Sequence, residues 1–319
     1  MDIRFAPMEG VTDTVFRQIH HKCFCGVSRY YIPFVSPTQN HFFTAREMKA
    51  ISPESNAGMN AIPQLLAKDP EHFLWAAGEL HAMGYEEVNL NIGCPSGTVT
   101  AKGKGAGMLR DPDGLQRFLE AVFEHTPIAI SVKTRIGFES PDEWPAILRV
   151  LSAFPLRELI IHPRTRTGFY KGPLYRECFE QAVAMGLPVV YNGDLFTRAD
   201  CDELRERHPE VPMMLGRGLI ANPALARELN GGEPVNAKDL QYFHDELQRA
   251  YLAQYPKAQV HSRMREVMKY ISCCFQDADK ALKAIRKSTP ETYPTAVERL
   301  LACPLREDPG YRMTTWLGE

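Results

Sequence analysis

One cysteine of the sequence stands where its thiol could do chemistry. Cys94 follows the apolar run EVNLNI and lies between Gly93 and Pro95. As a nucleophile, it would need to be a thiolate with a base nearby, such as His162. As an acid, it would need to keep its proton, which a thiol with the ordinary pKa of about 8.5 mostly does at pH 7. The residues alone leave both roles open.

Polar residues and glycines recur at the ends of other apolar runs. They are Pro7-Met8-Glu9, Gln64, Asn91 with Cys94, Lys133 with Arg135, His162 with Arg164, Asn192-Gly193-Asp194, and Gly216-Arg217-Gly218. Each alone has an ordinary structural explanation, but their recurrence predicts one active site where strand ends meet. The glycines after the last two runs leave backbone N–H groups accessible to a phosphate, and Arg217 could add a charge-assisted hydrogen bond.

These residues need a scaffold of parallel strands to bring them together. Short β-rich runs alternate with amphipathic stretches up to about residue 220, and eight of them are predicted strands, starting near residues 3, 30, 61, 87, 128, 158, 188 and 212. Eight strands, each followed by a helix or a long loop, predict a (β/α)8 TIM barrel. A Rossmann sheet is the rival, but no G-x-G-x-x-G follows the first strand.

The character of the sequence changes near residue 230, where NGGEPVNAKD is typical of a linker. Beyond it, four segments place apolar residues three and four positions apart, as helices do: 239–255, 262–275, 277–288 and 294–303. We therefore predict a catalytic barrel over residues 1–235, followed by a small all-helical domain over residues 236–319.

The composition sets only broad limits. The 319 residues are 44% hydrophobic and 24% charged, as in ordinary globular proteins, and the net charge of −2 does not decide for or against a polyanionic partner. The N-terminus lacks a signal-peptide pattern and no long apolar run occurs, so we expect a cytoplasmic protein. Eight cysteines without Cys/His ligand spacing predict neither a metal site nor disulfides.

Positive charge is concentrated in the predicted helical domain. Between Lys257 and Lys287 the chain has eight Lys or Arg residues against three acidic ones. Such a stretch suits contacts with nucleic-acid phosphates. The glycine-rich stretch Gly103–Gly107 near the cysteine is a different feature: it has no Walker pattern, and we interpret it as a mobile lid or a solvated loop.

The motifs, taken in order, resemble those of the tRNA-dihydrouridine synthases. They are APMEGVTD at 6–13, NLNIGCPS at 89–96, KGAGMLRDP at 104–112, SVKTRIGF at 131–138, IHPRTRTGFYKG at 161–172, YNGDL at 191–195 and GRG at 216–218. The resemblance implies a flavin-dependent bacterial barrel with a helical tRNA-binding domain. Its implied activity is the reduction of particular tRNA uridines to 5,6-dihydrouridine, with FMN as cofactor and NADPH as electron donor.

The resemblance also implies a role for each motif residue. Cys94 would protonate C5 of the uracil while C6 receives a hydride from flavin N5, and Asn91 would bind the base. FMN would be held by Pro7, Met8, Glu9, Gln64, Lys133, His162, Asn192, Gly193, Asp194, Gly216 and Arg217. The resemblance and the basic stretch together imply candidates for contact with tRNA, which are Arg135, Arg164, Arg166, Lys257, Arg263, Arg265, Lys283, Arg286 and Lys287.

Two departures from the family pattern leave the modified uridine unassigned: Gly97 stands where several relatives carry lysine, and residues 30–60 match only loosely. The nearest alternative is a flavin-dependent barrel that reduces a free pyrimidine or another small molecule. A catalytically silent tRNA-binding protein and a sugar-phosphate isomerase or aldolase are further rivals. We expect a monomer whose partners are tRNA and NADPH, with no membrane partner.

Overall fold

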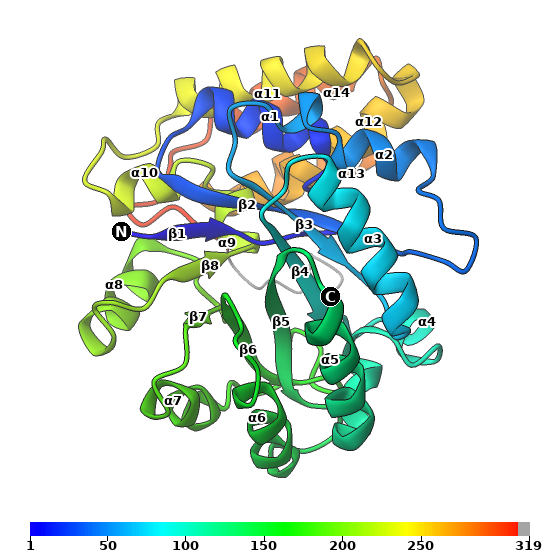
Figure 1. Cartoon of the computed structure of the whole chain (residues 1–319). Coiled ribbons are helices and arrows are strands. Elements are labelled where there is room, and N and C mark those ends of the chain that lie inside the picture. The colour runs from blue at the N-terminus through cyan, green and yellow to red at the C-terminus, as the bar shows by residue number, and fades with distance from the viewer. Residues whose placement is uncertain (312–319) are drawn as a thin grey trace. The chain divides into compact units, whose positions relative to one another are not determined.

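The computed structural model describes residues 1–311, and its strands form a closed parallel barrel in chain order (Figure 1). The strands are β1 Ile3–Phe5, β2 Val27–Val35, β3 Ala61–Leu65, β4 Glu87–Ile92, β5 Ala129–Gly137, β6 Leu159–Thr165, β7 Val189–Tyr191 and β8 Met213–Leu215. All eight predicted strands are confirmed, and with them the (β/α)8 class. β5 and β6 extend to Gly137 and Thr165, beyond the apolar runs that predict them.

Helices follow the strands as the sequence predicts. Those of the barrel are α1 Thr14–Cys23, α2 Ala45–Ile51, α3 Pro70–Ala82, α4 Gly97–Thr100, α5 Pro112–His125, α6 Trp144–Ser152, α7 Arg176–Ala184, α8 Arg198–Arg207, α9 Arg217–Ala221 and α10 Leu225–Leu229, with short 3-10 helices η1 Glu54–Asn56, η2 Gly105–Arg110 and η3 Pro141–Glu143. Capping side chains help to determine where helices α3 and α5 begin. Asp69 and Asp111 each accept a backbone N–H of the first turn, and proline follows both aspartates.

The C-terminal segment is helical, as predicted. It contains α11 Ala237–Leu252, α12 Lys257–Ile271, η4 Ser272–Cys274, α13 Asp279–Lys287 and α14 Tyr293–Leu301. Asn236 caps α11 by accepting the N–H of Asp239. The last residues of the predicted domain, 312–319, lie outside the described residues, and the boundary at 235/236 remains a prediction.

The chain divides into two compact units. Unit 1 comprises Met1–Tyr30, Asp194–Glu210 and the residues from Leu215 onward, and unit 2 comprises Tyr31–Gly193 and Val211–Met214. Unit 1 therefore contains both β1–α1 and the C-terminal helices. Within it, α11 runs alongside α1 (Figure 1), and the Phe243 ring packs edge-on against Phe16 and Phe24, with ring centroids 5.6 and 5.5 Å away.

Unit 2 carries the central strands with their helices. Every residue of β4 and β6 is buried, as expected of parallel strands covered on both faces. Apolar side chains of β4 alternate with Asn89 and Asn91, so this strand presents a row of amides on one side. These amides begin the candidate site.

Candidate active site

A ladder of buried side chains crosses β3, β4 and β5 of unit 2. Gln64, Asn89 and Ser131 are register partners on the three strands. Gln64 Nε2 donates to Asn89 Oδ1 at 2.7 Å, and Asn89 Nδ2 donates to Ser131 Oγ at 2.9 Å. Because the buried polar groups pair with one another, the ladder fixes the orientation of Gln64.

The ladder continues to the cysteine through Asn91. Its Nδ2 donates to Gln64 Oε1 at 2.8 Å, while its Oδ1 accepts the backbone N–H groups of Gly93 at 3.1 Å and Cys94 at 2.9 Å. Asn91 thus closes the turn that carries the half-buried Cys94. This positions the cysteine backbone, while base binding by Asn91 stays a prediction.

The segment after α4 folds back on the cysteine turn. Ala106 N donates to Cys94 O at 3.1 Å, and Gly105 lies so close that an added Cβ would be 3.0 Å from the Cys94 Cβ atom. Residues 105–109 are buried. The interpretation of this stretch as a solvated loop is therefore wrong from Gly105 on, because the backbone packs against the cysteine.

Two cations of β5 lie near Cys94, and their pKa values are depressed. Loss of solvation, together with the nearby Arg135 charge, lowers the pKa of Lys133 to about 7, whereas Cys94 acts in the opposite direction. Burial likewise lowers the pKa of Arg135 to about 10. Among the described residues, no carboxylate forms an ion pair with Lys133, so its ammonium group has no internal counter-ion.

The three arginines predicted at the rim bind the protein's own loops. Arg135 Nε donates to Gly93 O at 3.0 Å, and its Nη1 donates to Thr165 O at 2.8 Å and Phe169 O at 2.7 Å. Arg164 Nε donates to Gly172 O at 2.6 Å, and its Nη1 lies 3.2 Å from His162 Nε2. Arg166 Nε donates to Pro95 O at 3.1 Å.

These bonds have a consequence for the predicted tRNA contacts. Arg135 is 1% exposed and Arg164 is 3% exposed, so both guanidinium groups are held inside unit 2, where they fix the loop after β6. Arg166 is half-buried and lies over the rings of Phe138 and Phe169, 5.1 Å from each centroid. Direct contact of the three arginines with RNA remains a prediction.

Several of the residues predicted to hold FMN belong to unit 1. Met8 N donates to Thr12 Oγ1 at 2.8 Å, which shapes the loop after β1. Gly216, after β8, lies against Met8, because an added Cβ would be 3.2 Å from Met8 Sδ. Arg217 Nη2 donates to Asp194 Oδ1 at 3.3 Å. Pro7 is half-buried and Glu9 is exposed.

Unit 2 supplies the remaining predicted FMN residues. Besides Gln64 and Lys133 they are His162, Asn192 and Gly193. Asn192 Nδ2 donates to Met214 O at 2.8 Å and so joins the ends of β7 and β8. Gly193 leaves little room for a side chain, since an added Cβ would lie 3.1 Å from atoms of Leu174, Pro163 and Tyr191.

The basic residues of the C-terminal helices fall into separate groups. Lys283, Arg286 and Lys287 line one cavity of about 280 Å³ on α13, and Lys257 lines another of about 270 Å³. Arg265 Nη1 donates to Arg286 O at 2.9 Å. The structure thus places four of the six predicted cations along cavities of the helical segment.

Arg263 differs from those cations because it contacts the start of α1 within unit 1. It forms an ion pair with Asp13, the N-cap of α1, and lies over the Tyr255 ring at 4.7 Å. Tyr251 Oη donates to the same carboxylate at 3.0 Å. This use of Asp13 is not predicted by the sequence, although Asp13 belongs to the motif APMEGVTD, and neither is the role of Asn89 in the ladder.

Among residues 1–311, no group of three or more metal-ligating side chains comes together. In the same part of the chain, none of the helices has the length and apolarity needed to cross a bilayer.

The fold is shared with solved structures of low sequence identity. A variant of NCR from Zymomonas mobilis aligns with a TM-score of 0.51 at 14% identity, covering 73% of this chain and 87% of that one. A structure of DHODH from Eimeria tenella aligns with a TM-score of 0.52 at 12% identity, covering 80% and 86%. At such identities the similarity concerns the barrel alone.

Three sequence relatives are named as tRNA-dihydrouridine synthases. A tRNA-dihydrouridine(16) synthase of Pseudomonas syringae pv. tomato is 26% identical over 91% of this chain and 95% of its own length, and one of Cupriavidus necator is 28% identical over 88% and 91%. A probable tRNA-dihydrouridine synthase of Staphylococcus aureus is 30% identical over 68% of each chain.

The fold and the sequence relatives together define the class as a (β/α)8 oxidoreductase. The family model of the dihydrouridine synthases matches residues 4–298, and the chain belongs to this family. It is therefore a flavin-dependent oxidoreductase, as the motif resemblance predicts.

Proposed function

We propose that the protein reduces uridine in tRNA to 5,6-dihydrouridine, with FMN as cofactor and NADPH as electron donor. The observation that carries the proposal is the family match over residues 4–298, combined with a hydrogen-bonded turn that presents Cys94. Several relatives are named for position 16, including those of Pseudomonas syringae pv. tomato and Cupriavidus necator. Position 16 is therefore the uridine that we propose as the target.

The residues present fit a flavin. Lys133 is a desolvated cation without an ion-pair partner among the described residues, and an anionic group nearby would compensate its charge. At Gly216 any side chain would crowd Met8, which explains the glycine. A glycine also lets the backbone approach a ligand closely. The residues that would hold FMN are Pro7, Met8, Glu9, Gln64, Lys133, His162, Asn192, Gly193, Asp194, Gly216 and Arg217.

The chemistry that bound FMN supplies is hydride donation to C6 of the uracil, which no protein side chain can provide. The C5–C6 double bond also needs a proton at C5, and we assign this step to Cys94 Sγ as general acid. Asn91 contributes by holding the turn, because its Oδ1 accepts the N–H of Cys94. Arg135 holds the same turn through its hydrogen bond to Gly93 O.

Access of the base to Cys94 needs a change in the RNA. A uridine within folded tRNA is stacked or paired, so it must leave its stack to reach the thiol, at a cost of a few kcal/mol. Binding energy from the rest of the tRNA must offset that cost. This requirement favours an extended tRNA-binding surface, for which we propose Lys257, Arg265, Lys283, Arg286 and Lys287.

The test uses purified holoenzyme, NADPH and an unmodified tRNA transcript, with dihydrouridine mapped by mass spectrometry. We expect modification at position 16, and we expect Cys94→Ala to lower the rate by about 10²- to 10⁴-fold while the bound-flavin absorbance is retained. Cys25→Ala removes an exposed thiol and serves as the control that keeps full activity. Reduction of free uracil without any modification of tRNA would contradict the proposal.

A further inference from the structure

Three lysines gather in unit 2 beside the cysteine turn, and none has a role in the site described so far. Lys68 follows β3, while Lys102 and Lys104 flank Gly103 after α4. An added Cβ on Gly103 would lie 3.6 Å from Lys68 Cδ and 3.8 Å from its Nζ, so the Lys68 side chain lies over the turn between the other two lysines. We call these three residues the lysine cluster.

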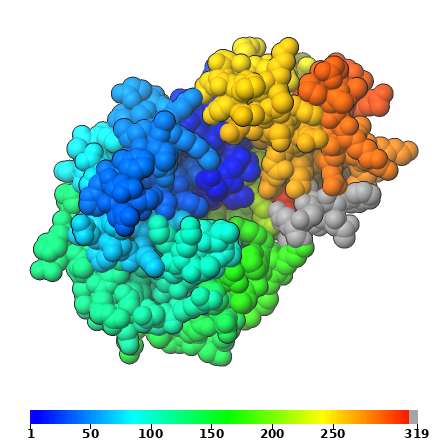
Figure 2. All heavy atoms as spheres, turned by 90° about the vertical axis from the view of Figure 1, so that its right-hand side faces the viewer, coloured from blue at the N-terminus to red at the C-terminus, as the bar shows by residue number. Residues whose placement is uncertain are grey.

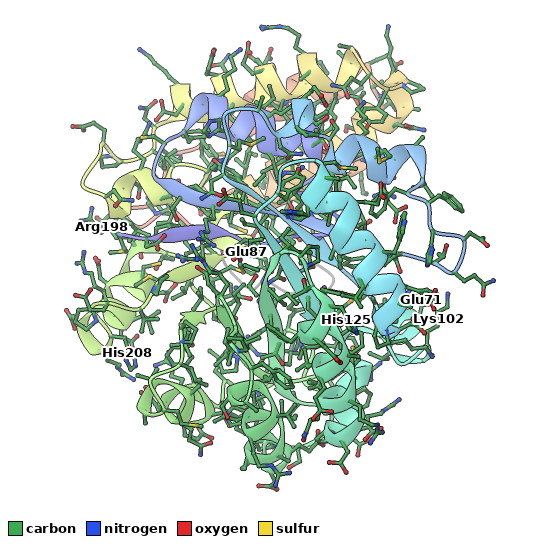
Figure 3. The ribbon with its side chains drawn as sticks, in the orientation of Figure 1. Glu71, Glu87, Lys102, His125, Arg198 and His208 are labelled. Atoms are coloured by element: carbon green, nitrogen blue, oxygen red, sulfur yellow. The ribbon has the colours of Figure 1, made fainter. Side chains whose placement is uncertain are left out.

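The lysine cluster belongs to the surface formed by α2, α3 and α4. Figure 3 shows Lys102 beside α4 at the edge of the molecule. This side faces the viewer in Figure 2, where the segment after β2 adjoins the segments of α3 and α4. Lys68 and Lys102 are exposed, and Lys104 is half-buried. The cluster is therefore accessible to a large ligand such as RNA.

Lys104 is fixed by the loop that follows β2. Its Nζ donates to Ser36 Oγ at 2.8 Å, and that hydroxyl donates in turn to Leu66 O at 3.2 Å. Burial, and the charges of Lys102 and Lys68, lower the pKa of Lys104. The fold thus holds an ammonium group in place next to two like charges.

In the part of the chain that the structure describes, the lysine cluster has no paired acidic side chain. Within residues 1–311, none of the three lysines forms an ion pair. Glu47 acts favourably on the Lys104 charge, but its oxygens already accept the N–H groups of Ser36 and Thr44. Like charges held close without a counter-ion destabilise the folded protein, and a bound anion would remove that repulsion.

The cluster is joined to the cysteine turn by the next residues of the chain. Gly105 follows Lys104 directly and contacts Cys94, and Ala106 N donates to Cys94 O at 3.1 Å. A uridine whose base reaches Cys94 carries its phosphates on the same ribose. Those phosphates must therefore pass over the protein surface immediately outside the cysteine turn.

We propose that Lys68, Lys102 and Lys104 bind phosphate groups of the tRNA strand next to the uridine that reaches Cys94. This inference rests on the proposed function. The cluster would hold the backbone of the extruded nucleotide while its base is at Cys94, whereas the C-terminal helices would bind other parts of the tRNA. Lysine ammonium groups suit this task because they bind phosphates regardless of the base sequence.

The experiment measures the affinity of holoenzyme for tRNA as a function of salt. Each phosphate contact contributes about 0.7 to 0.9 to the slope of log affinity against log salt. We expect the triple variant Lys68→Gln/Lys102→Gln/Lys104→Gln to lose about two from this slope and to bind tRNA about 10- to 100-fold more weakly at low salt. The double variant Lys68→Gln/Lys102→Gln changes only exposed side chains and should show about one to two units of the same loss.

The matched control is Arg117→Gln on α5. Arg117 belongs to the same unit, its side chain is 70% exposed, and the variant also removes a positive charge. It should bind tRNA as the wild type does. The cluster variants should keep their flavin absorbance and their rate of flavin reduction by NADPH, because the proposed ligand of the lysines is RNA and neither flavin nor NADPH.

The outcomes separate this inference from the proposed function. Wild-type affinity and slope in the triple variant would overturn the inference. So would a raised KM for NADPH with unchanged tRNA affinity, since the cluster would then bind the phosphates of the dinucleotide. If the wild-type holoenzyme itself binds no tRNA, the proposed function fails, and the lysine cluster has no RNA ligand.

Discussion

Lys133 carries a charge that the folded chain disfavours. Its pKa falls from 10.5 to about 7, mainly because the folded protein desolvates the ammonium group. Below pH 7 the lysine is charged in both the folded and the unfolded state, so the full penalty lowers stability. Between about pH 7 and 10.5 the folded state loses the proton before the unfolded state does, and stability rises with pH.

Lys133→Met should therefore stabilise the flavin-free protein at pH 6, and the gain should shrink toward pH 10. Urea denaturation at the two pH values measures the effect, because the midpoints of variant and wild type should converge at the higher pH. Lys238→Met removes an exposed lysine on α11 and should show no such convergence. A gain of equal size at both pH values would mean that packing, and not charge, is responsible.

Arg135 acts at the same scale through its hydrogen bonds. Its guanidinium donates to the carbonyls of Gly93, Thr165 and Phe169, and a lysine ammonium cannot reach all of them in this fork geometry. Each buried carbonyl without a donor costs about 1–3 kcal/mol, so Arg135→Lys should lower the free energy of unfolding by about 3 kcal/mol. Urea denaturation tests this against Arg149→Lys, an exposed change on α6 that should be neutral.

At the scale of elements, Gly105 shows why η2 begins with a glycine. Its φ of +57° favours glycine, and an added Cβ would lie 2.9 Å from Val99 Cγ1 and 3.0 Å from Cys94 Cβ. Gly105→Ala should displace the cysteine turn, and a displacement of about 1 Å can lower a catalytic rate about 100-fold. The rate of dihydrouridine formation, measured with flavin bound, is the readout.

The control for Gly105 is Gly186, after α7. Its φ is +68°, but nothing lies within 4 Å of an added Cβ. Both alanine variants should lose about 1–2 kcal/mol of stability from the left-handed backbone, and only Gly105→Ala should also lose turnover. Equal turnover in the two variants would show that the contact with Cys94 does not matter.

The sequence predicts elements better than it predicts the contacts between them. The eight strands and the helices could be predicted because each has a local apolar period and local end signals, such as Asp69 before Pro70. The bond of Lys104 to Ser36 spans 68 residues, and that of Arg135 to Phe169 O spans 34. No local pattern encodes such pairs, so the lysine cluster and the loop-binding arginines emerged only from the fold.

At the scale of the whole chain, the same limit applies to the domains. The spacing of apolar residues predicts a barrel followed by helices, but the compact unit that contains α11–α14 also contains β1 and α1. The reason is an apolar face on α1 that α11 covers, with Phe16, His20 and Phe24 all packed around Phe243. The apolar face of α1 can be recognised in its sequence. The sequence does not show that α11, more than 200 residues later, covers this face.

A fragment of residues 1–235 should therefore fail to fold cooperatively, because α1 would expose Phe16 and Phe24, which are 0% and 4% exposed in the full chain. In the full chain, Phe243→Ala should lower the free energy of unfolding by about 3–5 kcal/mol, as expected for a large buried aromatic ring. Its neighbour Tyr242 is 53% exposed, so Tyr242→Ala should change stability by less than about 0.5 kcal/mol. Urea denaturation of the variants and gel filtration of the fragment provide the test. A fragment that melts cooperatively, together with a Phe243→Ala variant as stable as Tyr242→Ala, would show instead that the barrel folds independently and that the helical segment is an appendage.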